Sequence, residues 1–180
     1  MPNLTTHIHF ALLFCERAKY DIHLPSLFEG AVGPGFHSGQ YANAQSHGAD
    51  TDISKEESGI ASLSYRLGYL SHSFLDHYFD AYRAEIFLFM SPLKEERMRR
   101  VSMAEQIDIR HMKEHETVLK SLSQKYGGEF TALYHAVSES EGRYTEIERD
   151  YEDLMTGLAE KFTQFLKALN FTSASDDLIP

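Results

Sequence analysis

Apolar positions recur at helical intervals along most of this 180-residue chain, and no stretch shows a sustained alternation of apolar and polar residues. That periodicity is typical of amphipathic α-helices whose apolar faces pack on a common core. The pattern therefore predicts an all-α fold: a single-domain bundle of about five main helices over residues 1–172, with a flexible tail at 173–180.

The first predicted helix is followed by a long irregular connection. Thr5 or Thr6 is expected to cap this helix, which runs to about Tyr20. Residues 21–52 are rich in glycine and proline, so apart from one turn of helix at "PSLFEG" we expect a loop. A loop of this length is usually functional or disordered. The aromatic residues of this segment favour a functional loop, and so do its three histidines, His23, His37 and His47.

A second helix is predicted from Asp52 or Ser54 to Met90. If it were straight, it would measure on the order of 50 Å at the usual rise per residue. A bundle of this size does not need so long a helix. We therefore expect a kink or a break near Gly59 or Gly68.

The remaining chain is predicted to be helical with two interruptions. Ser91 as a cap and Pro92 at the first helical position indicate the start of a third helix, which ends at the glycines of "YGG". A short helix is expected around "FTALYHAV" and a turn at "SESEG". The last helix begins near Arg143, and its apolar face consists of Leu154, Leu158, Phe162, Phe165, Leu166 and Leu169.

Composition narrows the class of partner and the environment. The hydrophobic content of 42% is sufficient for a core, and the formal net charge of −10 opposes binding to polyanions. We therefore expect no nucleic-acid partner. The only cysteine, Cys15, lies in an apolar helical stretch and is expected to be a buried thiol. The N-terminus carries no signal-like or spanning apolar run, which predicts a soluble, cytoplasmic protein with no transmembrane segment.

Two helical stretches carry acids and imidazoles at spacings that put them on one face. His72, Asp76 and Asp80 are each four residues apart, and Asp108, His111 and His115 follow at i, i+3 and i+7. Two such stripes suit a divalent metal held between helices, since a metal stabilises buried carboxylates and neutral imidazoles. The histidines favour zinc, with iron or manganese as alternatives. Either stripe alone is also typical of surface ion pairs or of a hydrogen-bonded core feature.

The order of several motifs resembles that of the zinc-dependent phospholipase C family. The chain opens with "MPNLTTHIHF", where the family has a Met-Pro segment, a Thr-His pair and an aromatic residue. "AVGPGFH" resembles the family's glycine-proline-aspartate loop, and "YRLGYLSHSFLDHYFDAY" resembles its His-x-x-x-Asp helix. A later family helix carries His-x-x-x-Glu, where this chain has "RHMKEH". The resemblance covers about the first 120 residues and implies an all-α, metal-dependent hydrolase.

Carried over to the matching positions, the resemblance implies metal ligation by a set of side chains consisting of His7, His72, Asp76 and His111, with His47 of "QSHG" as a further candidate. Three positions depart from the family pattern. Gly35 stands where the family has a metal-bridging aspartate, so either His37 or Asp50 replaces that ligand or the site holds fewer ions. Asp80 stands for a histidine and His115 for a glutamate, and both keep a ligand side chain.

The resulting expectation is a metal-dependent phosphoester hydrolase in which an activated water attacks a phosphodiester. Asp76 would ligate the metal, and Asp80 would accept the proton of the water. The substrate, a small phosphoester or a phospholipid head group, is implied by the resemblance alone. An alternative is a catalytically silent, metal-stabilised helical domain that binds a ligand through residues 21–52, which Gly35 favours. A third possibility is a plain helical bundle with surface histidines and no metal site.

Overall fold

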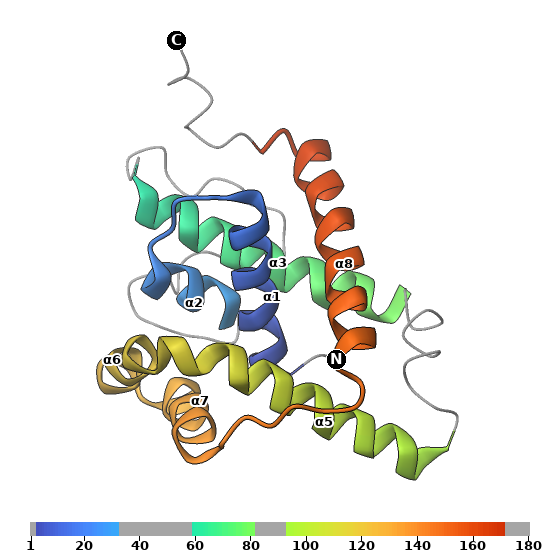
Figure 1. Ribbon diagram of the computed structural model, residues 1–180. Helices are drawn as coiled ribbons and strands as arrows, with labels where there is room; N and C mark the ends of the chain where they lie inside the picture. The colour runs from blue at the N-terminus through green and yellow to red at the C-terminus, as the bar shows by residue number, and fades with distance from the viewer. Residues whose placement is uncertain (1–2, 33–58, 82–92, 172–180) are drawn as a thin grey trace.

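The computed structural model describes residues 3–32, 59–81 and 93–171, with the side chains of 79–81 excepted. These residues are helical for most of their length and contain no β-strand, which confirms the predicted all-α class (Figure 1). The elements in chain order are α1 (Leu4–Ala18), α2 (Leu24–Val32), α3 (Ile60–Ala81), α5 (Lys94–Met112), the 3₁₀ turn η1 (Lys113–His115), α6 (Glu116–Tyr126), α7 (Gly128–Glu139) and α8 (Glu148–Ala168).

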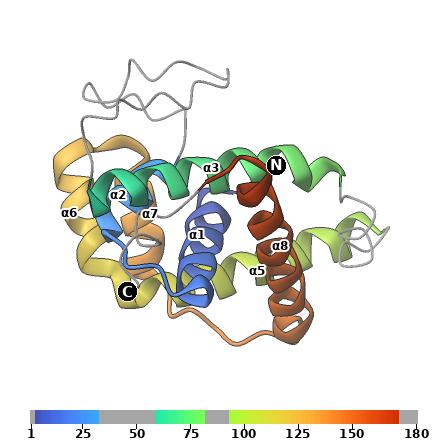
Figure 2. The same ribbon diagram turned by 90° about the horizontal axis from the view of Figure 1, so that it is seen from above.

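Helix α1 is the central element of the fold. It lies between the α2–α3 pair on one side and α5 and α8 on the other (Figure 2). Asn3 caps it, because the Asn3 Oδ1 accepts the backbone N–H of Thr6 at 2.9 Å. The prediction of Thr5 or Thr6 as the cap is therefore wrong, and both residues lie in the first turn of the helix.

The core is built on aromatic side chains from three helices. Phe10 of α1, Phe74 of α3 and Phe162 of α8 are fully buried, and the ring centroids of Phe74 and Phe162 are 5.1 Å apart. Cys15 is a buried free thiol in the same hydrophobic core, as the sequence predicts. Burial raises the pKa of the Cys15 thiol to about 12, because the thiolate would lose its hydration there.

Helix α2 occupies the start of the predicted loop, so the structure has nine helical residues where one turn was expected. It packs closely on α3. A Cβ placed on Gly68 would lie 2.2 Å from the carbonyl oxygen of Leu27, and one placed on Gly30 would lie 2.1 Å from that of Tyr65. Gly68 therefore allows two backbones to approach each other and does not interrupt α3. Of the two expected sites for a kink or break, Gly59 fits, because it is not helical and α3 begins at the next residue, whereas Gly68 does not. The remainder of the predicted loop, residues 33–52, lies outside the described residues.

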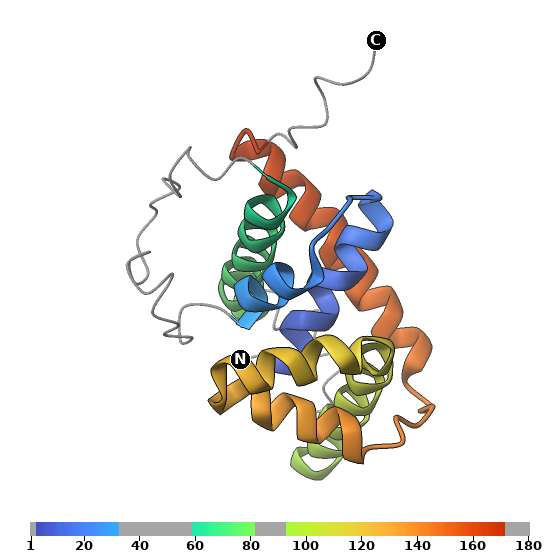
Figure 3. The ribbon, with the colours of Figure 1, turned by 90° about the vertical axis from the view of Figure 1, so that its left-hand side faces the viewer.

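The predicted third helix is divided into α5 and α6 by the 3₁₀ turn Lys113–His115. Ser91 and Pro92, its predicted start, lie outside the described residues. Helices α6 and α7 pack against each other; α6 also contacts α2, and α7 contacts α5 (Figure 3). No helix in the described part of the chain is both long and apolar enough to span a bilayer.

The last helix begins later than predicted. Residues 143–147 are not helical, and α8 starts at Glu148. Three of its predicted inner positions, Leu158, Phe162 and Leu166, are buried, whereas Leu169 follows the helix and is exposed. The predicted tail, residues 173–180, lies outside the described residues.

Candidate metal site

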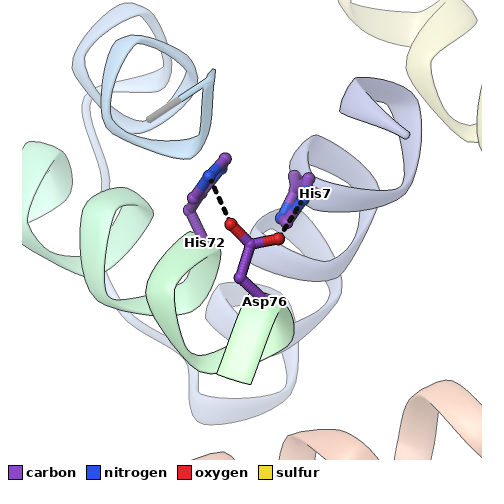
Figure 4. A group of neighbouring side chains, drawn as sticks. All are labelled: His7, His72 and Asp76. Carbon is purple, nitrogen blue, oxygen red and sulfur yellow. Dashed lines mark ion pairs between the residues drawn. The ribbon is translucent and has the colours of Figure 1, made fainter. Parts of the chain in front are cut away.

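Two helices bring three candidate ligands together. His7 comes from α1, and His72 and Asp76 are one turn apart on α3 (Figure 4). The Nε2 of His7 is 3.5 Å from Oδ1 of Asp76, and the Nε2 of His72 is 3.1 Å from Oδ2. One ligand atom from each residue lies within 4.8 Å of the others, and no other three such side chains in the described ranges come this close.

The imidazole of His7 is a neutral group in this environment. Its residue is 2% exposed, and burial lowers the pKa of His7 to about 3, with the charge of the neighbouring His72 acting in the same direction. The two rings stack, with centroids 4.0 Å apart. The Nδ1 of His7 is buried and has no hydrogen-bond partner among the described residues. A neutral imidazole is the form that ligates metals.

The hydrogen bond of His72 determines which of its nitrogens is available. Its Nδ1 lies 2.9 Å from the carbonyl oxygen of Ala31. A carbonyl oxygen only accepts, so Nδ1–H donates, and in the neutral ring the Nε2 then carries a lone pair. That lone pair faces a carboxylate oxygen of Asp76. Two acceptors at this distance repel each other unless a proton or a metal ion lies between them.

The three side chains line a cleft of about 600 Å³ that is open to solvent. Asp76 is the more accessible member, with 39% of its side chain exposed. The other lining residues come from the start of α1, the end of α2, and from α5 and α7; they are Asn3, Leu4, Thr5, Val32, Glu105, Glu129, Ala132, Leu133 and Ala136. No lysine or arginine is among these described lining residues.

A second buried polar cluster includes Asp108, which the sequence placed with His111 and His115. The Asp108 carboxylate is fully buried and receives hydrogen bonds, each 2.7 Å long, from the hydroxyls of Thr6 and Tyr151 and from Nδ1 of His9. The His9 ring stacks on that of His111, with centroids 4.3 Å apart. This cluster connects α1, α5 and α8, and its hydrogen bonds offset the cost of burying the carboxylate.

The structure does not bring His111 or His115 into the group formed by His7, His72 and Asp76. His111 lies against His9, whereas His115, at the start of α6, packs edge-on against Phe28 of α2 with ring centroids 5.9 Å apart. Positions i, i+3 and i+7 share one face only in an unbroken helix, and here the 3₁₀ turn Lys113–His115 follows α5.

Other predicted site residues lie outside the described part of the chain. They are His47 and the positions Gly35, His37 and Asp50, together with the side chain of Asp80. His77, next to Asp76, is exposed with its ring against Tyr78. The sequence pattern did not identify His9 as part of a buried polar cluster. Its apolar helical context in "THIHF" was a sign that its side chain is buried.

Comparisons with family models, with curated proteins and with solved structures found no match to this chain.

Proposed function

We propose that this protein is a metal-dependent phosphoester hydrolase whose divalent ion is held by His7, His72 and Asp76. The observation that carries the proposal is the arrangement of these side chains: two imidazoles and one carboxylate converge from two helices at the wall of an open cleft. Two histidines and one carboxylate are a ligand set of catalytic zinc sites, which leave a further coordination position for water or substrate. Zinc is therefore the favoured ion.

The residues of the chain have distinct tasks in this proposal. His7 and His72 supply neutral nitrogen ligands, and the charge of Asp76 offsets part of the charge of the ion. A bound divalent ion would lower the pKa of a water molecule and neutralise charge on a phosphoester. Asp80, one turn beyond Asp76, is the candidate proton acceptor.

The substrate class is taken from the family resemblance, and the lining of the cleft adds apolar surface for part of the substrate. Leu4, Val32 and Leu133 line it and offer apolar surface to the uncharged part of a substrate. A small phosphoester or a phospholipid head group remains the proposed substrate.

A catalytically silent, metal-stabilised binding domain is the second candidate. The observation that favours it is the acidity of the cleft, where Glu105 and Glu129 join Asp76 without a lysine or arginine among the described lining residues. Such a surface does not attract an anionic phosphate before a metal ion is bound.

The deciding experiment combines zinc titration with hydrolysis of bis(p-nitrophenyl) phosphate, with and without chelator. The substitution Asp76→Asn keeps the shape of the side chain but removes its charge, so zinc affinity and hydrolysis should fall together by at least about tenfold. The matched control is His77→Ala, the exposed neighbouring position, which should retain both.

Two results would change this conclusion. Parental zinc affinity and hydrolysis in Asp76→Asn would refute the proposed site. Stoichiometric zinc that is lost in Asp76→Asn, without turnover of phosphodiesters or phosphomonoesters by the parent, would favour the silent binding domain.

A further inference from the structure

We propose that the C-terminal turn of α2 is a positioning element for the metal site: the Ala31 carbonyl fixes the tautomer of His72, and the Gly30–Gly68 contact holds that carbonyl in place. This proposal rests on the proposed function, because it takes from it that His72 is a ligand of a divalent metal ion. The contacts themselves are independent of the ion, so the two ideas can fail separately.

The first step concerns the hydrogen bond between α2 and α3. Ala31 is the next-to-last described residue of α2, and the residues described after it supply no helical partner for its carbonyl oxygen. The Nδ1–H of His72 donates to this oxygen at 2.9 Å. Metal-ligating histidines typically donate their second ring nitrogen to a carbonyl or carboxylate, which orients the ring and raises the basicity of the ligating nitrogen. The partial negative charge at the end of α2 acts in the same direction.

The second step concerns how α2 is held against α3. Gly68 lies one turn before His72, and a Cβ placed on it would be 2.2 Å from the Leu27 carbonyl oxygen and 2.7 Å from the backbone nitrogen of Ala31. This close approach between the two helices therefore includes Ala31, whose carbonyl oxygen accepts the hydrogen bond of His72. Gly30 makes the reciprocal approach, 2.1 Å from the carbonyl oxygen of Tyr65.

A side chain at Gly68 would separate the helices. The obstacle is backbone, which does not rotate away, so α2 would have to retreat by about 1 Å to reach ordinary van der Waals contact. The same displacement would lengthen the bond from His72 to Ala31 to about 4 Å, beyond hydrogen-bond range. His72 would then lose the partner that selects its tautomer.

His7 provides an internal contrast. Its Nδ1 has no hydrogen-bond partner among the described residues, although the residue is as deeply placed as any in the site. His72 is therefore the ligand that a neighbouring element orients, and α2 is that element.

The first test is ¹⁵N NMR of the histidine rings in the metal-free protein. The pH is raised until the ¹⁵N shifts of the His72 ring stop changing, so that the neutral ring is observed. We expect His72 to carry its proton on Nδ1, whereas an unconstrained imidazole in water prefers Nε2–H. The internal reference is the exposed His77, whose ring contacts Tyr78. A proton on Nε2 of His72 would overturn the proposal.

The second test is zinc binding by Gly68→Ala. We expect zinc affinity to fall by about tenfold or more and the Nδ1–H signature of His72 to be lost. The matched control is Gly157→Ala in α8, where an added Cβ meets nothing within 4 Å, and its zinc affinity should equal that of the parent. A folded Gly68→Ala with parental affinity and the parental tautomer would refute the proposal.

The outcomes separate this proposal from the metal site itself. If Asp76→Asn loses zinc while folded Gly68→Ala keeps it, only the role of α2 is refuted. If Asp76→Asn keeps zinc, the ligand set is wrong, and the tautomer of His72 still decides whether α2 orients this ring. If Gly68→Ala does not fold, the tautomer of His72 in the parent protein decides alone: a proton on Nδ1 supports the role of α2, and a proton on Nε2 refutes it.

Discussion

At the scale of residues, the two buried histidines of α1 have opposite roles. His7 and His9 are two positions apart, so they lie on different sides of the helix. His9 meets Asp108, a fully buried carboxylate that also receives two hydroxyl donors. His7 meets Asp76, a partly exposed carboxylate that faces two ring nitrogens. The first acid is satisfied by protein donors, and the second is available to a cation.

The substitution Asp108→Ala should lower the free energy of unfolding by about 3–5 kcal/mol, because it removes the buried carboxylate to which His9, Thr6 and Tyr151 donate. Asp108→Asn keeps one acceptor oxygen, so it should lower the free energy of unfolding by less. Urea denaturation measures both. If zinc affinity fell in Asp108→Asn while stability did not change, the structural role assigned to this carboxylate would be wrong.

At the scale of elements, the helices that form the site are set by their ends and contacts. The Asn3 cap fixes the start of α1 one turn before His7, and Asn3 also lines the cleft. The end of α2 provides the Ala31 carbonyl to His72. The 3₁₀ turn Lys113–His115 divides the predicted third helix and separates His115 from His111. Helix termini, which periodicity does not define, therefore have a large influence on the site.

Removing the cap tests the first of these points. Asn3→Ala should destabilise the protein by about 1 kcal/mol, because the N–H of Thr6 loses its acceptor. Thermal or urea unfolding measures the change, and Asn3→Asp, which retains an acceptor at the cap, should restore most of the loss. Equal losses in the two variants would show that the side chain acts through something other than the cap.

At the scale of the whole molecule, α1 and α3 come from different parts of the chain, and a metal ion between them would link the two. An ion that binds only the folded state adds stability by mass action. At a zinc concentration about 100-fold above the dissociation constant, removal of zinc should lower the thermal midpoint by about 5–10 °C. Scanning calorimetry with zinc and with chelator measures this difference.

The control for that measurement is Asp76→Asn, whose midpoint should hardly respond to chelator. An unchanged midpoint in the parent protein after thorough chelation would contradict a metal that joins these helices.

The sequence by itself determined the all-α class and the positions of most helices, because helical periodicity is a local property. It also determined that His72 and Asp76 lie together, since residues four apart on one helix are neighbours whatever the rest of the chain does. The burial of Cys15 and of the α8 positions Leu158 and Phe162 follows from the same local pattern.

Only the tertiary structure decided which other residues join that pair. His7 does so, whereas His111 lies against His9. The choice depends on which faces of α1, α3 and α5 meet, and no spacing within one helix specifies that. The close contact of Gly30 with α3 likewise depends on packing between distant segments. Helical periodicity also does not reveal the 3₁₀ turn that separates α5 from α6. The cleft and the hydrogen bond between His72 and Ala31 each join residues of different helices, so they are properties of the assembled helices.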